Sequence, residues 1–363
     1  MGAASTPPPG ASTSSPAPAA AEDPHHHHIE VDRDLYPENG PDDDDDDGYS
    51  SAGVSDASTS LASSILDFKW ENNRRYHKFR EGEYHFPNDE PEQERENIKH
   101  LMVLQLLGNK LFLAPVDLED GNRTKKVLDV GTGTGAWAID IGDEFPKADI
   151  IGIDLSPIQP SWLPPNVRFR VDSAEDDWLD YESFDFIHLR HMNAAIKDWP
   201  QFFDRAYRHT KPGGWIELQE YDFTLTSDDN SLAGDWPYYK CSKLIHQGLE
   251  ALGVVPHSTL RNPQYLRDAG FTNITTKVFK VPLGVWPKDR TLKTIGMYQR
   301  HAMVDGLNAI TMGPFTRGLK WKPEEVEVFL VEVRRTIEDP KVHSYFPFHV
   351  VYAQRPEETG EGS

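Results

Sequence analysis

A glycine-rich segment in the middle of the chain has residue types and spacing suited to nucleotide chemistry. Gly131, Gly133 and Gly135 follow the apolar run Lys126–Val130 and precede a stretch with helical spacing. A strand, a glycine turn and a helix allow the backbone to approach a ligand where any Cβ would intrude. The segment therefore predicts a cradle for a nucleotide-containing cofactor.

The glycine pattern alone fits two cofactor classes. Gly131, Gly133 and Ala136 satisfy the G-x-G-x-x-G/A pattern of dinucleotide sites, and Asp154 lies at the spacing of about 20 residues expected for a ribose-binding acid. Asp129 discriminates between the classes, because a carboxylate two residues before the first glycine would face the negative pyrophosphate of a dinucleotide. S-adenosylmethionine (SAM) carries a sulfonium and an ammonium group and no phosphate, so Asp129 favours SAM.

Alternating apolar runs and helical patterns after residue 121 predict an α/β fold with a parallel sheet. The expected strands lie near Lys126–Val130, Asp149–Asp154, Val167–Val171, 184–189 and 215–221, and the expected helices near 136–145 and Trp199–His209. The run 211–214, Lys-Pro-Gly-Gly, predicts a tight turn before the fifth strand. Ligands of such sheets bind beyond the carboxyl ends of the strands.

Acidic residues stand at three successive strand ends. Asp154 can accept hydrogen bonds from both ribose hydroxyls, and Asp172 can accept one from the adenine amino group. An isolated aspartate at such a position is often only a turn residue, but three together favour ligand roles. The predicted cofactor-binding residues are Asp129, Gly131, Gly133, Gly135, Asp154, Leu155, Asp172, Ser173, Ala174, Leu189 and Arg190.

Methyl transfer from a sulfonium needs a positioned nucleophile and at most one base. His191 is the candidate catalytic base, because it follows the fourth strand on the expected substrate side and histidine ionises near neutral pH. Glu220, His257 and His301 are rival candidates. A packed or solvated histidine without a chemical role is an equal alternative for each. No residue cluster has the spacing of metal ligands, and the reaction requires none.

Composition limits the classes of partner. The 363 residues have a net charge of −22, and residues 1–62 hold 13 acidic residues and one arginine. The sequence has no broad basic face, so direct nucleic-acid binding is not expected. No apolar run approaches the ~18 residues of a membrane span, and no leader pattern is present. A single cysteine, Cys241, excludes an internal disulfide and favours a cytoplasmic or nuclear setting.

Residues 1–62 are rich in Ala, Ser and Pro and are expected to form a disordered, acidic, low-complexity tail. The histidines 25–28 are a candidate metal site, and the aspartates 42–47 are a candidate site for a basic protein partner. A solvated tail without either role is the simpler interpretation.

Two helices are expected between residues 63 and 120, as a cap over the cofactor edge of the sheet. The first rests on the helical spacing of Leu61, Ile65, Phe68 and Asn72, and the second begins with the capping pattern at 88–91. The basic cluster 74–80 is a candidate nuclear-import signal, a candidate part of a lid, or one charged helix face.

Several of these segments together resemble the fungal class I SAM-dependent methyltransferases of the LaeA-like group. The resemblance spans about residues 66–356, and its matching segments are 70–76, 129–135, 154–166, 197–200, 207–221 and 348–356. The Ser-Pro-Ile-Gln-Pro block at 156–160 is far more specific than the glycine loop. Thr132 and Thr134 stand where LaeA-like regulators tend to carry cysteine, so the chain is more similar to the general and secondary-metabolite branch than to LaeA itself.

The resemblance implies a Rossmann-like, seven-stranded, mostly parallel sheet whose last strand is antiparallel. Segments 271–282 and 345–353 match the last two strands. The helical insertion between them, about 287–340, is expected to help roof the substrate pocket. Around it the chain divides into the tail 1–62, the cap 63–120, the methyltransferase domain 121–356 and the terminal segment 357–363.

The sequence thus predicts an enzyme that transfers a methyl group to oxygen or nitrogen of an unidentified acceptor, a small molecule of secondary metabolism. Six aromatic residues are candidates for holding an apolar acceptor or equally for an ordinary core: Trp236, Tyr238, Tyr239, Trp286, Tyr298 and Phe315. One alternative is a LaeA-like nuclear regulator that acts through protein partners or protein methylation. A nicotinamide-dependent oxidoreductase is a third, which the acids at 129 and 172 oppose.

Overall fold

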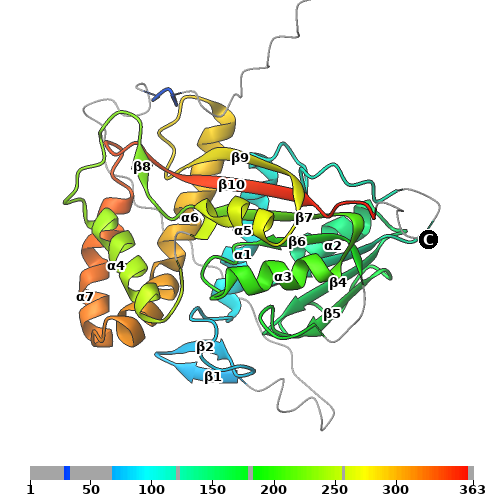
Figure 1. Ribbon diagram of the computed structural model, residues 1–363. Coiled ribbons are helices and arrows are strands. Elements are labelled where there is room, and N and C mark those ends of the chain that lie inside the picture. The colour runs from blue at the N-terminus through cyan, green and yellow to red at the C-terminus, as the bar shows by residue number, and fades with distance from the viewer. Residues whose placement is uncertain (1–27, 33–67, 120–122, 179–182, 256–257, 359–363) are drawn as a thin grey trace, which may run out of the picture.

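The computed structural model describes residues 28–32, 68–119, 123–178, 183–255 and 258–358. At its centre is an eight-stranded sheet in the order β5-β4-β3-β6-β7-β10-β8, with β9 paired to β10 (Figure 1). Strands β3 to β7 run parallel, whereas β10 is antiparallel to both β7 and β9. The strands are β3 (Lys126–Val130), β4 (Asp149–Asp154), β5 (Val167–Val171), β6 (Phe184–Arg190), β7 (Thr210–Tyr221), β8 (Thr226–Ser227), β9 (Thr272–Pro282) and β10 (Ser344–Gln354).

Helices cover both faces of the sheet. The fully buried aromatic side chains of Trp199, Phe202 and Phe203 on α3 pack on one face, and Trp137 and Ile141 on α2 pack on the other. This double cover explains why β4 and β6 consist almost entirely of buried residues. The helices here are α2 (Ala136–Glu144), α3 (Trp199–His209), the short helix η2 (Ser258–Leu260) and α5 (Asn262–Asp268).

A second group of helices packs beside the β7, β9 and β10 part of the sheet and forms its own apolar core. Helix α1 lies along α6, where the side chain of Arg95 fills the space above Gly306. The predicted insertion 287–340 is helical, as expected. The helices of this group are α1 (Glu90–Leu106), α4 (Pro237–Ala251), α6 (Arg290–Gly313), the π-helical turn η3 (Pro314–Gly318) and α7 (Pro323–Ile337).

The predicted parallel strands, α2, α3 and the antiparallel last strand are confirmed by the structure. Two details differ. The sheet has an eighth strand, because the two residues of β8 pair with the start of β10. The predicted turn at 211–214 lies inside β7, where the pairing register with β6 shifts and Gly213 adopts φ 77°. The turn chemistry was recognised correctly, but it produces an irregular strand rather than a break.

The predicted helix near 61–76 is wrong. Residues 68–77 form the antiparallel hairpin β1 (Phe68–Glu71) and β2 (Arg74–His77), and residues 61–67 lie outside the described residues. Asn72 and Asn73 adopt φ values of 51° and 59°, which suit a two-residue turn with left-handed residues. The helical spacing of the apolar residues was outweighed by this turn.

The hairpin cations are fixed to the start of α1. The guanidinium of Arg74 donates to both carboxylate oxygens of Asp89, at 2.6 and 2.7 Å, and Arg75 donates to Asn88 and Glu90. Asp89 also caps α1 by accepting a hydrogen bond from the backbone N–H of Glu92. These arginines are therefore engaged within the fold, which weighs against a freely presented import signal.

The prediction that residues 1–62 are wholly disordered is wrong for residues 28–32. Ile29 is buried against Trp286 and Tyr345, and Val31 forms a β-bridge with Pro287. The predicted histidine run before residue 28 and the aspartate run 42–47 lie outside the described residues. The acidic composition of this segment gave no sign that a single isoleucine, Ile29, would pack into the core with backbone hydrogen bonds beside it.

Replacing Asp89 by Ala should lower the free energy of unfolding by about 2–4 kcal/mol, because the change removes a helix cap and leaves the half-buried Arg74 without its carboxylate. Urea unfolding measures the effect. Asp143→Ala, at an exposed position on α2, is the control and should change stability by less than about 0.5 kcal/mol. Equal stabilities of the two variants would contradict the role given to Asp89.

Candidate functional site

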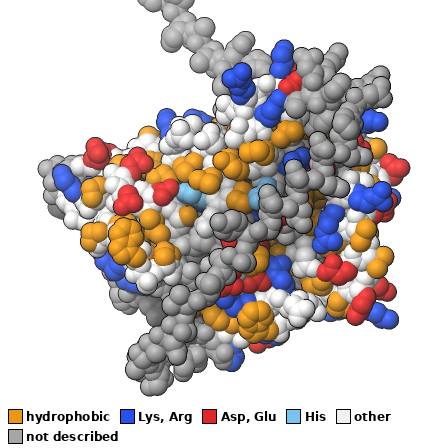
Figure 2. Space-filling model, turned by 180° about the vertical axis from the view of Figure 1, so that it is seen from behind, with side chains coloured by type: hydrophobic (Ala, Val, Ile, Leu, Met, Phe, Trp, Pro, Cys, Tyr) orange, Lys and Arg blue, Asp and Glu red, His pale blue; other side chains and the backbone are white. Residues whose placement is uncertain are grey.

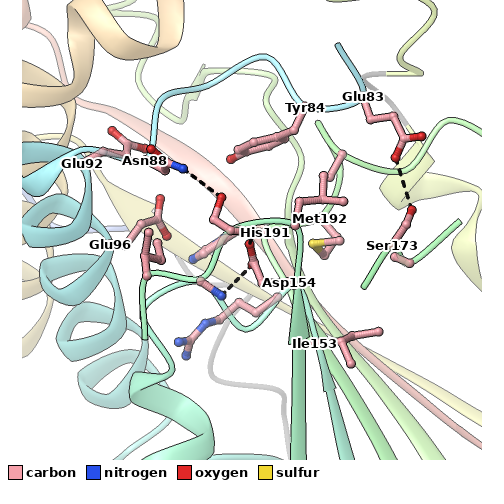
Figure 3. Close-up of a pocket in the computed structure, with 18 of the residues that line it drawn as sticks. Glu83, Tyr84, Asn88, Glu92, Glu96, Ile153, Asp154, Ser173, His191 and Met192 are labelled. Carbon is pink, nitrogen blue, oxygen red and sulfur yellow. Dashed lines mark hydrogen bonds between the residues drawn. The ribbon is translucent and has the colours of Figure 1, made fainter. Parts of the chain in front are cut away.

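A cavity lies at the carboxyl ends of β3 to β6, between two walls (Figure 3). The strand-end wall comes from the loops after these strands, within 131–133, 153–158, 172–175 and 190–195. The N-terminal wall comes from residues 83–88 and the N-terminal half of α1 up to Lys99. The strand ends thus meet at one site, as the parallel topology requires.

The glycine loop forms the floor of the cavity. Gly131, Gly133 and Gly135 have φ values of 69°, 57° and 83°, which favour glycine. A Cβ on Gly131 would lie 2.1 Å from Sδ of Met192, whereas a Cβ on Gly133 would meet no protein atom within 4 Å. Gly133 therefore faces open space. Gly135 does not line the cavity, and its missing Cβ makes room for the ring of Phe169.

Asp154 ties the glycine loop to the end of β4. One carboxylate oxygen accepts the backbone N–H of Gly133 at 2.9 Å, and the other accepts that of Ser156 at 2.8 Å. Burial raises the pKa of Asp154 above its usual value, although both hydrogen bonds favour the carboxylate. Each oxygen keeps a further lone pair for a ligand.

Asp129 lies beside this cavity rather than on its wall. It lines a smaller adjoining cavity, which shares Gly131, Gly133 and Arg190 with the main one. Its two oxygens accept hydrogen bonds from the hydroxyl of Thr132 at 2.6 Å and from Nδ1 of His188 at 2.8 Å. Asp129, a predicted cofactor-binding residue, thus lies next to the glycine loop, but its charge is partly satisfied within the protein.

The remaining predicted cofactor residues divide into two groups. Leu189 has a fully buried side chain in the core of the sheet and does not reach the cavity. Arg190 lies between the two cavities and donates to Nδ1 of His100, whose Nε2 contacts Asp140 at 2.8 Å. Of these remaining predicted residues, five line the main cavity: Leu155, Asp172, Ser173, Ala174 and Arg190.

His191 lines both cavities and has a left-handed φ of 59°. Its ring stacks on Tyr221, with centroids 5.3 Å apart, and both ring nitrogens are buried without a hydrogen-bond partner among the residues that the structure describes. Burial, with the nearby charges of Lys99 and Arg190, holds the pKa of His191 well below its usual value. Burial and these cations therefore disfavour the protonated imidazole, which leaves a ring nitrogen able to accept a hydrogen bond but makes the ring a weaker base.

The rival base candidates lie elsewhere. Glu220 is buried beneath the loop after β6 and accepts the backbone N–H groups of Met192 and Asn193 at 2.7 and 3.2 Å. It therefore positions His191 rather than facing the cavity. His301 is exposed on α6 and paired with Asp305, and His257 lies outside the described residues.

The sequence analysis expected residues 63–120 to cap the cofactor edge but named none of the residues that form the N-terminal wall. Glu83 accepts a hydrogen bond from the hydroxyl of Ser173 at 3.2 Å, and Asn88 donates one to Ser156 at 3.0 Å, so each crosses between the walls (Figure 3). No local pattern could reveal contacts that join residues 68 to 90 positions apart in the sequence. The helix-start pattern at 88–91 was the one signal that placed this segment near the edge.

Helix α1 presents buried charges to the cavity, and they neutralise one another. The guanidinium of Arg95 bonds to Glu92 and Glu96, and the ammonium of Lys99 donates to Glu96 at 2.8 Å. Coulombic attraction to Lys99 and Arg95 holds the pKa of Glu96 down at about 2 against its burial. Pairing at spacings of one and three residues explains how this helix accommodates four largely buried charges.

Two features expected on the acceptor side do not belong to this cavity. No residue of the insertion 287–340 lines it, because α6 packs against α1 and α7 packs against α6. None of the six aromatic residues proposed for an apolar acceptor lines it either, and Trp236, Tyr238, Trp286 and Phe315 are core residues. The alternative of an ordinary core holds for these four.

Comparison with known proteins identifies similar chains. A family model described as "Methyltransferase domain" matches residues 99–276. The chain is 42% identical to "Methyltransferase pytC" of Aspergillus terreus, over 82% of this chain and 91% of that protein. It is 38% identical to "Secondary metabolism regulator LAE1" of Cochliobolus heterostrophus (79% and 95%) and 32% identical to "Protein-methionine methyltransferase laeA" of Emericella nidulans (80% and 77%).

The buried Glu220 predicts a pH dependence of stability. Burial raises its pKa to about 8, so the folded protein holds this proton more tightly than the unfolded chain, and stability is lost as the pH rises. From pH 6 to pH 9, the wild type should lose about 2–3 kcal/mol more unfolding free energy than Glu220→Gln. Urea titrations at both pH values, with Glu144→Gln as the exposed control, measure this difference. Parallel losses in all three proteins would contradict it.

Proposed function

The chain belongs to the fungal LaeA-like family of class I SAM-dependent methyltransferases, and from this premise we propose that its strand-end cavity binds SAM and methylates a small-molecule acceptor. The observation that carries the proposal is the hydrogen bond from the backbone N–H of Gly133 to Asp154. Gly133 faces open space, and Asp154 is the candidate acid for binding a ribose. The assignment to this family rests on sequence similarity to its members across most of the chain.

The residues present fit SAM. Gly133 leaves the space that a Cβ would fill, and the two unpartnered ring nitrogens of His191 are buried polar atoms at the same cavity. We assign the ribose to Asp154, the adenine to the Asp172–Ala174 segment and the methionine end to the side of Gly131 and Arg190. Asp129 supplies negative charge behind the loop at that end.

When bound, SAM supplies a methyl group that is already activated by its sulfonium leaving group. The contribution of the chain is then to position the acceptor and, where the acceptor loses a proton, to take it up. His191 is our candidate for that role, because its neutral imidazole lies on the wall shared by both cavities. Glu220 holds the backbone that follows His191 and is a positioning residue.

The acceptor is proposed to be a small molecule of secondary metabolism, methylated on oxygen or nitrogen. Support comes from the 42% identity to a protein named as a methyltransferase and from a cavity that is lined by apolar side chains, such as Tyr84, Leu155 and Met192, as well as by charged ones. Incubating the protein with SAM and a cell extract, followed by mass spectrometry for species heavier by one methyl group, tests this proposal. An extract without any SAM-dependent methylated product would count against it.

A second candidate function is regulation of secondary metabolism through protein partners or protein methylation. It is favoured by the regulators among the relatives and by the name protein-methionine methyltransferase of one of them. In this proposal the acidic tail holds partners in the cytoplasm or nucleus. Pull-down with and without residues 1–62 tests it. In the described residues, no helix is both long and apolar enough to cross a membrane.

Asp154→Asn should weaken SAM binding about 100-fold, because an amide replaces the charged acceptor for two ribose hydroxyls, worth about 3 kcal/mol together. Isothermal titration calorimetry measures the affinity. Asp143→Asn on the exposed face of α2 should bind like the wild type. Unchanged affinity in Asp154→Asn would falsify the assignment of the ribose to this residue.

His191→Asn should lower the rate of methyl transfer about 10²- to 10⁴-fold and leave SAM affinity within about twofold, because only the base is removed. Asparagine is chosen because it tolerates the left-handed φ. The rate is followed as labelled methyl incorporated from SAM into the extract-derived acceptor. A wild-type rate in the variant rules out His191 as the base, and a large loss of SAM affinity assigns it to cofactor binding instead.

A further inference from the structure

A short loop lies at the rim of the cavity, between two anchored segments. Residues 78–84, here called the lid loop, follow β2 and precede the buried run 85–89. The ring nitrogens of His77 contact the carbonyl oxygens of Phe79 and Tyr84 at 2.7 and 3.1 Å, which gathers the loop into one unit. Arg80 and Gly82 adopt left-handed φ values of 54° and 89° and give the loop its sharp bend.

Three contacts hold the N-terminal wall against the strand-end wall. Arg80 forms an ion pair with Asp176 in the loop after β5, and Glu83 accepts the hydroxyl of Ser173 at 3.2 Å. Just past the lid loop, Asn88 donates to Ser156 at 3.0 Å. Figure 3 shows Glu83 and Ser173 joined at one side of the cavity and Asn88 at the other, with Tyr84 between them.

Elsewhere the lid loop is held mainly by exposed contacts, such as the ion pair between Glu81 and Lys69 at 2.6 Å. Lys78, Arg80, Glu81 and Gly82 are exposed, whereas Tyr76 and His77 before the loop and residues 85–89 after it are buried. Segments with few buried contacts open at low free-energy cost, and their buried flanks act as hinges. The lid loop therefore has the features of a part that opens while the hairpin and α1 stay in place.

We propose that the lid loop is a gate for the cofactor, latched by the ion pair between Arg80 and Asp176. This inference rests on the proposed function. Glu83 and Tyr84 line the cavity together with Asp154 and Ser173, so a ligand between the walls touches both of them only when the loop is closed. A ligand that has more contacts in the closed form shifts the loop toward it, and closure in turn slows release of the ligand.

The latch residues are suited to a test because neither Arg80 nor Asp176 lines the cavity. Arg80→Gln, Asp176→Asn and the double variant remove the pair. The matched control is Glu81→Gln, which breaks the neighbouring exposed ion pair between Glu81 and Lys69, at 2.6 Å, on the side away from the strand ends. Both ion pairs are exposed, so their general effects on stability should be small and similar.

The experiment measures release of S-adenosylhomocysteine from the full chain by stopped-flow displacement, with hydrogen exchange of residues 78–84 as a second readout. In the wild type, the ligand should slow exchange in the lid loop. Each latch variant should release the ligand about two- to fivefold faster, the double variant no faster than either single one, and Glu81→Gln at the wild-type rate.

The inference is overturned if the latch variants and the control release the ligand equally fast, or if ligand leaves exchange of residues 78–84 unchanged. Additive effects of the two single variants would also contradict a shared latch. Failure of the wild type to bind S-adenosylhomocysteine at all would overturn the proposed function instead, so the two failures are distinguishable.

Discussion

The left-handed backbone of the glycine loop is the constraint on which the rest of the site depends. Gly131 has no room for a Cβ beneath Met192, and Gly133 offers its N–H to Asp154 while its other face stays open. A half-buried carboxylate at the end of β4 thus fixes the loop after β3. Because both strands are parallel and adjacent, this hydrogen bond spans the edge of the sheet where ligands of such folds bind.

The second wall is stable for a different reason. Helix α1 brings Glu92, Glu96 and Lys99 to the cavity, and these charges pair with one another or with Arg95, which avoids leaving an uncompensated buried ion. The hairpin cations hold the beginning of the same helix through Asp89. The walls come from segments far apart in the chain, so the cavity exists only once the sheet and the N-terminal cap have docked. This arrangement combines a rigid floor with a weakly held rim.

The sheet and the strand-end wall of the cavity could be predicted from the sequence because both depend on local patterns of residues. Buried parallel strands appear as apolar runs, and the residues that follow them, such as Asp154 and Asp172, must share one edge. Long-range contacts leave no such trace, so the bond of Glu83 to Ser173 was missed. The hairpin around Asn72 was mistaken for a helix because its apolar residues have helical spacing. The left-handed conformation of the two asparagines decides for a turn instead. The aromatic residues fitted a core and a pocket equally, and only packing separated these interpretations.

The central claim is that one cavity between these two walls holds S-adenosylmethionine. A crystal structure of the full chain grown with S-adenosylhomocysteine and, separately, with a nicotinamide dinucleotide tests it most directly. The account predicts density for the first ligand alone, with its ribose at Asp154 and its adenine beside Ser173, and with Glu83 and Tyr84 covering it. Density for the dinucleotide at the glycine loop, or the homocysteine ligand bound away from Asp154, would contradict the account.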